Sequence, residues 1–219
     1  MEVVGYRSDM AGEVSSVYDE AVRDVPHCYP VSEDAFAAEL AAAAGGESSH
    51  ERLHSEAAFV GSEAGRIIAF AHVGVERPKE EGEADQGVIR FLWYPRGRRR
   101  IGQSLLAAAE DHLRGRGMSR AFAFPHDWRY RFYHFKNAYL SDHLDHVQAL
   151  LAFNDYRRSF GEAFLDWPDY DPVVPLPTEI EAEIRVEERP GRGRRPGLRV
   201  SAHGDGKQLG ECVSLSAAE

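Results

Sequence analysis

The stretch 87–124 constrains the fold of this chain more than any other part of it. A run of mostly apolar, β-prone residues, 88–94, meets Pro95 and a short loop that holds four arginines. A strongly helical segment, 103–116, follows, and a second short apolar run covers 121–124. Strand, basic loop, helix and strand form a β-loop-α-β unit, which places a helix N-terminus over an anionic ligand. The stretch therefore predicts an anion site where its helix begins.

Length and composition favour a water-soluble protein with a sizeable core. The 219 residues, 43% of them hydrophobic, suffice for one large domain, or for one domain with an appendage. No apolar run approaches the roughly 18–20 residues that a membrane span needs, and the N-terminus lacks the basic and apolar regions of a signal peptide. The two cysteines, Cys28 and Cys212, lie far apart, which favours a reducing compartment. We therefore expect a cytoplasmic protein without a membrane partner.

The charge balance is acidic, with 26 Lys and Arg against 36 Asp and Glu and a formal net charge of −10. General nucleic-acid binding depends on a basic surface, so we expect no nucleic-acid partner. Arginines nevertheless gather at 96–100 and again at 189–195. The second group lies among glycines and prolines and is interpreted as a solvated turn. The first group lies between a strand and a helix and is interpreted as the binding site of a local anion.

Before residue 87 the pattern predicts a strand, two helices and a hairpin. Residues 2–7 are expected to form the strand, residues 10–23 the first helix, and residues 32–45 the second. The hairpin covers 57–76, and its second arm is nearly all apolar, as expected of a strand covered on both faces.

After residue 124 the pattern is less regular. The aromatic residues between 128 and 139 are compatible with the wall of an acceptor pocket, with a mobile flap, or with ordinary packing. A helix is predicted over 143–154 and one or two strands over 156–167. Residues 168–178 are proline-rich and predict a linker. Residues 179–187 alternate between apolar and polar side chains, and residues 198–215 predict strand, turn and strand.

Two further groups of residues are candidates for metal binding or nucleophilic catalysis. His143 and His146 lie three positions apart, as zinc ligands on a helix do, but no third ligand has a recognisable spacing. We therefore predict no metal site. Cys28 lies between prolines without an arguable catalytic partner, so it is interpreted as a small buried side chain rather than a nucleophile.

The order of the expected elements over residues 1–167 resembles the GNAT (GCN5-related N-acetyltransferase) superfamily. The most specific piece is the segment 94–107, YPRGRRRIGQSLLA, which is similar to the family's pyrophosphate loop, Arg/Gln-x-x-Gly-x-Gly/Ala. Aligned on Ile101 and Gly102, the first glycine position of that pattern holds Arg100, and the leading Arg/Gln position holds Gly97. The resemblance implies an α/β fold, a GNAT-like mixed twisted sheet flanked by helices, with a C-terminal β-hairpin extension.

The resemblance also implies a reaction. Members of the family transfer an acetyl group from acetyl-CoA to an amine, so the chain is expected to be an acetyl-CoA-dependent N-acyltransferase that uses no metal. Its acceptor is expected to be a small-molecule or peptide amine, attacking the thioester directly. The implied cofactor-binding residues are Leu92, Trp93, Tyr94, Arg98, Arg99, Arg100, Ile101, Gly102, Gln103 and Ser104.

Two residues are implied for the catalytic side. Asn154 lies nearest the position of the family's tyrosine acid, and Tyr156, two residues on, is the nearest phenol, although its place also suits a core residue. Asp85 is the carboxylate nearest the strand 88–94 and is the candidate base.

The resemblance divides the chain into a GNAT-like domain (1–167), a proline-rich linker (168–178) and a β extension (179–219). The extension looks like the opening hairpin of a second domain of the family, either cut short or kept as an extension that packs on the first. A homodimer, or a contact with a second GNAT-like domain, is left open. The alternative function is a catalytically silent GNAT-like module with a structural or regulatory binding role.

Overall fold

The computed structural model describes residues 2–26, 28, 30–48, 50–78, 82–130, 132–133, 139–161, 181–189 and 197–214. The chain forms two compact units, Met1–Ala163 and Phe164–Glu219. The predicted linker 168–178 lies outside the described residues, as does nearly all of the arginine group 189–195.

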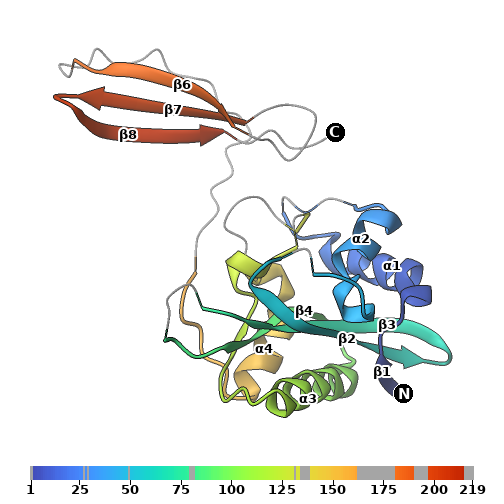
Figure 1. Ribbon diagram of the computed structural model, residues 1–219. Coiled ribbons are helices and arrows are strands. Elements are labelled where there is room, and N and C mark those ends of the chain that lie inside the picture. Colours follow the sequence, from blue (N-terminus) through green and yellow to red (C-terminus); the bar gives the residue numbers. More distant parts are fainter. Residues whose placement is uncertain are drawn as a thin grey trace. The chain divides into compact units, whose positions relative to one another are not determined.

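The first unit is a five-stranded mixed sheet with helices on both faces (Figure 1). The sheet order is β1-β2-β3-β4-β5, and every pair is antiparallel except β4 with β5. This arrangement confirms the predicted fold class. The elements are β1 (Glu2–Gly5), α1 (Ala11–Val22), α2 (Glu33–Glu39), β2 (Leu53–Glu63), β3 (Arg66–Glu76), β4 (Gln86–Trp93), α3 (Arg99–Gly115), β5 (Ala121–Ala123) and α4 (Asp145–Phe153).

The two faces of the sheet are covered differently. α1 and α2 lie on one face, whereas α3 and α4 lie on the other (Figure 1). Residues 69–75 of β3 are all buried, which agrees with the apolar sequence of this arm. Leu105, Leu106 and Ala109 of α3 are fully buried on their side of the sheet. The core therefore continues through the sheet, and β4 is held between two packed layers.

In the aromatic run after β5, Tyr130, Phe132 and Tyr133 belong to the core under α1 and α2, whereas Trp128 belongs to a smaller buried cluster with Leu53 and Val88. Trp128, Tyr130 and Tyr133 are buried, and the Tyr130 ring stacks on Phe91 with 5.6 Å between ring centroids. Phe132 packs edge-to-face on Tyr18 of α1 at 5.1 Å. Of the three interpretations left open, ordinary packing accounts for these four residues, while Phe135 lies outside the described part of the chain.

Several element boundaries differ from the sequence-based expectation; α2 ends at Glu39 rather than at residue 45, and β2 begins at Leu53 rather than at residue 57. α3 begins at Arg99 rather than at residue 103, because arginine is a good helix former and a turn at Gly97 (φ +80°) already directs the chain into the helix. The strand expected over 156–167 is absent from residues 156–161, which are described. There Asp155 adopts φ +64° and the Tyr156 N–H donates to Leu151 O (3.1 Å), so the chain turns back on α4. Residues 162–167 lie outside the described part.

The second unit contains an antiparallel sheet of β6 (Glu183–Arg189), β7 (Gly197–Gly204) and β8 (Lys207–Ser214) in that order. Asp205 (φ +51°) and Gly206 (φ +73°) connect β7 and β8, and two successive positive φ angles are typical of a tight hairpin turn. The relation of this sheet to a second GNAT-like domain stays a prediction. In the part of the chain covered by the structure, no helix is both long and apolar enough for a membrane crossing.

Candidate functional site

β4 separates from β5 at a β-bulge. The two strands pair only from Gly87 with Ala121 to Ile89 with Ala123. On its other edge, β4 pairs with β3 as Ile89 with Val73 and then as Phe91 with His72, so Arg90 is the extra, unpaired residue. A bulge bends its strand and often ends pairing. From residue 91 to 93, β4 therefore keeps β3 on one edge, while its other edge has no strand partner among the described residues.

The loop after β4 leads into a helix start with free N–H groups. The Arg98 N–H donates to Pro95 O (3.0 Å) and the Ile101 N–H to Arg98 O (3.0 Å). The N–H groups of Arg99 and Arg100 have no backbone acceptor within the described ranges. First-turn N–H groups and the helix dipole attract an anion, so this geometry suits the anion predicted from the sequence.

The four loop arginines differ in what they contact. Arg96 forms an ion pair with Asp145 of α4, Arg98 lies 3.1 Å from a Glu63 carboxylate oxygen, and the Arg99 guanidinium lies 4.4 Å from the ring centroid of Phe153. These three contacts are made at the surface, where an ion pair is worth little and can be exchanged. Arg100 is exposed, and its guanidinium has no hydrogen-bond or ion-pair partner among the residues that the structure describes. It is the loop arginine most available to a ligand.

α4 is held against the loop by contacts at both of its ends. At its start, the His146 Nε2–H donates to Tyr94 O (2.8 Å), while the Tyr94 hydroxyl donates to His146 O (2.8 Å). Burial lowers the pKa of the His146 imidazole, which favours this neutral donor. At its end, the side-chain amides of Gln103 and Asn154 exchange hydrogen bonds of 2.7 and 3.1 Å.

Most of the predicted cofactor-binding residues are brought together around this loop. Gly102 lies under the Tyr94 ring so closely that an added Cβ would be 2.5 Å from it, which explains a glycine at this position. The Ser104 hydroxyl donates to Arg100 O (3.0 Å) within the helix. Leu92, Trp93 and Ile101 are buried, so their side chains serve the core.

The two predicted catalytic residues lie elsewhere. The Tyr156 hydroxyl donates to Glu110 Oε1 (3.2 Å), and burial raises its pKa. Glu110 is eleven residues beyond Arg99, or about 16 Å along the helix axis. Asp85 precedes β4 and lies 3.3 Å from His54 Nε2, about 30 Å along the strand from Tyr94. The structure does not bring either residue to the loop, and their catalytic roles stay predictions.

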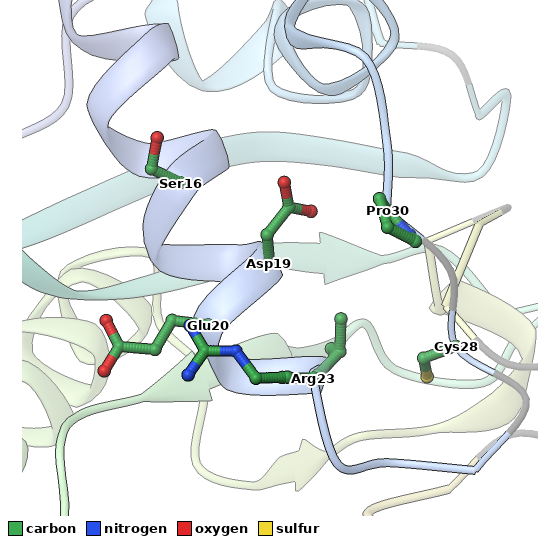
Figure 2. Close-up of a pocket in the computed structure, with 7 residues that line it drawn as sticks. Ser16, Asp19, Glu20, Arg23, Cys28 and Pro30 are labelled. Atoms are coloured by element: carbon green, nitrogen blue, oxygen red, sulfur yellow. The ribbon is translucent and has the colours of Figure 1, made fainter.

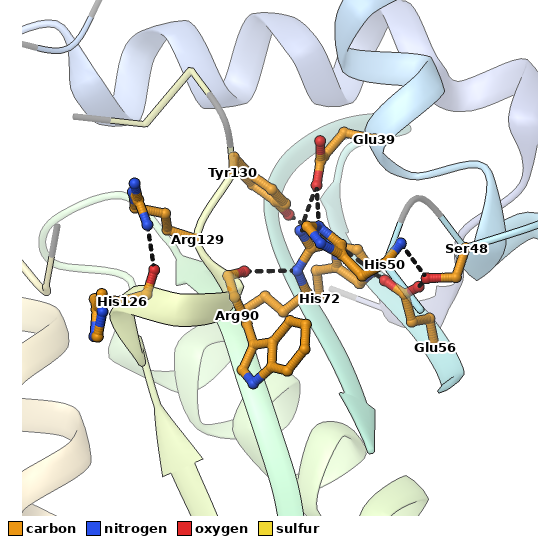
Figure 3. A network of polar contacts seen from close by, with 10 residues as sticks. Glu39, Ser48, His50, Glu56, His72, Arg90, His126, Arg129 and Tyr130 are labelled. Atoms are coloured by element: carbon orange, nitrogen blue, oxygen red, sulfur yellow. Dashed lines mark hydrogen bonds and ion pairs between the residues drawn. The ribbon is translucent and has the colours of Figure 1, made fainter. Parts of the chain in front are cut away.

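A buried polar cluster around Arg90 was missed by the sequence analysis (Figure 3). We call it the Arg90 cluster; it consists of Glu39, His50, Glu56, His72, Arg90 and Tyr130. Two bulges produce it, because the bulge at Arg90 turns that side chain inward and a second one in β2, at Ser55 (φ +51°) and Glu56, does the same for Glu56. The available signal was a charged or imidazole side chain inside an apolar strand, which has to find partners when it is buried.

All three nitrogens of the Arg90 guanidinium donate hydrogen bonds. Nε donates to Trp128 O (2.8 Å), Nη1 to Glu56 Oε2 (3.0 Å), and Nη2 to the Glu39 carboxylate. His50 Nε2 lies 3.0 Å from Arg90 Nη2 and donates to Glu39 Oε1 (3.3 Å). Burial raises the pKa of Glu39, but the His50 and Arg90 contacts outweigh it and hold the pKa below its ordinary value. The cluster is therefore anchored by two ionised carboxylates around one guanidinium.

Within the Arg90 cluster, His72 links Glu56 to Tyr130. It lies 3.1 Å from Glu56 Oε2 through Nε2 and 3.0 Å from the Tyr130 hydroxyl through Nδ1. Burial lowers its pKa in spite of Glu56. Nδ1 of neutral His72 accepts a hydrogen bond from the Tyr130 hydroxyl, and its Nε2 faces the Glu56 carboxylate. Hydroxyl, imidazole and carboxylate therefore form a continuous chain of polar contacts.

A pocket of about 380 Å³ lies beside the end of α1 (Figure 2). Asp19, Glu20 and Arg23 give it charged walls, and Cys28, predicted to be buried, is half-buried at its edge. Tyr18, next to Asp19, packs with its ring 5.5 Å from Phe91, the residue after the bulge.

Among the described residues, no group of three or more His, Cys, Asp or Glu side chains could hold a metal ion.

Comparison with known proteins gives similarity in structure only. No protein-family profile matches the chain, and no curated protein matches its sequence. The aminoglycoside 6'-N-acetyltransferase AAC(6')-IG from Acinetobacter haemolyticus has a TM-score of 0.51 and 9% identity over 76% of this chain and 98% of its own. AAC(6')-Iy, in complex with the bisubstrate analogue CoA-S-monomethyl-acetylneamine, has a TM-score of 0.51 and 11% identity over 76% and 97%. A ribosomal-protein-alanine N-acetyltransferase from Brucella melitensis biovar Abortus 2308 has a TM-score of 0.50 and 10% identity over 76% and 100%.

The fold is thus one shared by N-acetyltransferases with different acceptors. It is the GNAT fold, as the resemblance over the predicted strand, loop and helix implied.

Proposed function

We propose that the first unit binds acetyl-CoA and transfers its acetyl group to an amine. The observation that carries the proposal is the unpaired edge of β4 leading directly into a helix start with free N–H groups. A flexible arm with a thioester can hydrogen-bond to the free strand edge while its pyrophosphate meets the helix start. The GNAT fold of the unit supports the same assignment.

The residues take the following roles in this proposal. The pyrophosphate accepts hydrogen bonds from the N–H groups of Arg99 and Arg100 and from the Arg100 guanidinium. The pantetheine arm lies along Phe91–Trp93, and a backbone N–H near Trp93 stabilises the thioester oxygen. The neutral amine attacks the thioester carbon, a C–N bond forms and the C–S bond breaks. The nitrogen gives up one proton to water, and the thiolate that leaves takes one proton from water, so amide and free thiol are the products. The acceptor is an amine of a small molecule or a peptide.

A second candidate is a GNAT-like module that binds without catalysis. It is favoured by Arg100 at a glycine position of the family pattern and by the engagement of Tyr156 with Glu110. The engagement of Tyr156 does not exclude acetyl transfer, since a thiolate is a good leaving group and needs no phenol beside it.

One experiment separates these candidates. Thermal unfolding is measured with and without acetyl-CoA, and free thiol is then measured with a panel of primary amines. A ligand at 100 times its Kd stabilises the folded state by about 2.7 kcal/mol, which is readily measured. A shift with thiol release supports the enzyme, and a shift without release supports the silent module. Absence of a shift at millimolar acetyl-CoA overturns the proposed function.

A further inference from the structure

Arg90 lies at the point where β4 and the chain segment that follows β5 move apart. Ile89 is the last residue of β4 paired with β5, and Arg90 is the bulge residue that follows. On the β5 side, Phe124 donates its N–H to Ile89 O (2.8 Å) and then adopts φ +53°, a left-handed conformation that is uncommon for phenylalanine. The departing chain therefore leaves β4 within one residue of the bulge.

The Arg90 side chain reconnects β4 to that departing chain. Its Nε donates to Trp128 O (2.8 Å), five residues beyond Ala123, and its guanidinium lies 5.0 Å from the ring centroid of Tyr130. At the other end of the unpaired edge, the His146 Nε2–H donates to Tyr94 O (2.8 Å). The unpaired edge of β4 is thus tied at both ends to the chain segments that follow β5.

The tie at Arg90 is rigid because the guanidinium cannot rotate away. Glu56 and Glu39 hold its other nitrogens; Glu56 belongs to β2, within the sheet, and Glu39 to α2, which packs on the sheet. The side chains of Arg90 and Glu56 are 0% and 1% exposed. A planar fork that donates in several fixed directions sets the position of each acceptor, including a backbone carbonyl.

We propose that Arg90 is a positioning residue that sets the separation between β4 and the chain leaving β5, and thereby the slot for the pantetheine arm. The inference rests on the proposed function. Arg90 does not contact the helix start, so it acts on the arm and the thioester but not on the nucleotide end of CoA. Loss of the Trp128 tie lets the departing chain shift relative to β4, and small displacements of a reacting group are costly.

The test compares two ligands that differ by the arm. Dissociation constants of CoA and of 3′-phospho-ADP, which is CoA without pantetheine, are measured by calorimetry for each variant. Arg90→Lys keeps a positive charge between the carboxylates but lacks the fork that reaches Trp128 O. Arg90→Met with Glu39→Gln and Glu56→Gln removes both carboxylates together with the guanidinium, because an unpaired buried charge would itself destabilise the fold. Arg52→Met is the matched control, since Arg52 lies 5.0 Å from the Trp128 ring centroid but bonds to Glu76 and Arg77.

The expected result is a change in the ratio of the two affinities. Both Arg90 variants should weaken CoA binding by at least about tenfold, whereas 3′-phospho-ADP binding stays within about twofold and Arg52→Met changes neither. A folding defect alone would lower both affinities in proportion and leave their ratio unchanged. An unchanged ratio therefore overturns the inference while the proposed function stands. If the wild-type protein binds CoA no more tightly than 3′-phospho-ADP, the proposed function fails, and the inference fails with it.

Discussion

Replacement of Gly102 by alanine tests the packing that forms the loop site. An added Cβ would lie 2.5 Å from Cδ1 and Cε1 of the Tyr94 ring, well inside van der Waals contact. The ring cannot move aside, because it is 3% exposed and its hydroxyl donates to His146 O (2.8 Å). Overpacking costs about 1–3 kcal/mol, and alanine recovers at most about 1 kcal/mol of helix propensity, so Gly102→Ala should lower the free energy of unfolding by about 1–2 kcal/mol.

The same helix supplies the control. Gly115 ends α3, and a Cβ added there would meet no atom within 4 Å, so Gly115→Ala should be neutral or stabilising by up to about 1 kcal/mol. Both variants are measured by urea denaturation followed by circular dichroism. In a Tyr94→Ala background, Gly102→Ala should lose its penalty. The reasoning is refuted if Gly102→Ala is as stable as Gly115→Ala, or if its cost is the same with and without the Tyr94 ring.

Three further predictions concern charge and contacts. Stability should fall from pH 7 to pH 5, because burial lowers the pKa of His72 and the unfolded chain therefore binds the proton more readily than the folded chain. Stability should fall again below pH 4.5, because the contacts of Glu39 and Glu56 hold their pKa values low in the folded state. Urea denaturation of His72→Gln should lack the first loss and keep the part of the second loss that comes from Glu39, whose carboxylate is held by His50 and Arg90. Arg100→Ala should leave the melting temperature unchanged and weaken CoA binding about tenfold in calorimetry, less so at high salt; equal binding at low salt would contradict its assigned role. Asn154→Ala should cost about 1 kcal/mol of unfolding free energy and speed amide exchange in α4, and unchanged exchange would count against the amide pair as a tie.

The fold and the loop were predictable because they depend on local signals. Apolar runs, a glycine turn and a long helical segment are read within about twenty residues, and the β-loop-α-β order follows from them. The helix start was placed four residues late, at 103 instead of Arg99, because a run of arginines carries no apolar periodicity. The resemblance placed cofactor-binding residues on the strand before the loop, whereas the bulge at Arg90 that frees the edge of this strand is seen only in the structure.

The Arg90 cluster was not predictable for a physical reason. A strand alternates its side chains between two faces, and each bulge reverses that alternation from one residue onward. Only the register of β2 and β4 against β3 shows that Glu56 and Arg90 face the same side as His72. Likewise, His146 was considered as a metal ligand by its spacing, whereas its partner is a backbone carbonyl 52 residues away.

The ties between α4 and the loop imply an order of assembly. Tyr94 with His146, Arg96 with Asp145, and Gln103 with Asn154 each join residues about fifty positions apart. Such contacts close a long loop of chain, and the entropy of closure is lost before any of them forms. Strand, arginine loop and helix can therefore assemble first, and the docking of α4 completes them afterwards. A nascent chain that has emerged only as far as β5 carries the whole loop motif but not yet the finished site, so ligand binding should appear during synthesis only once α4 has emerged.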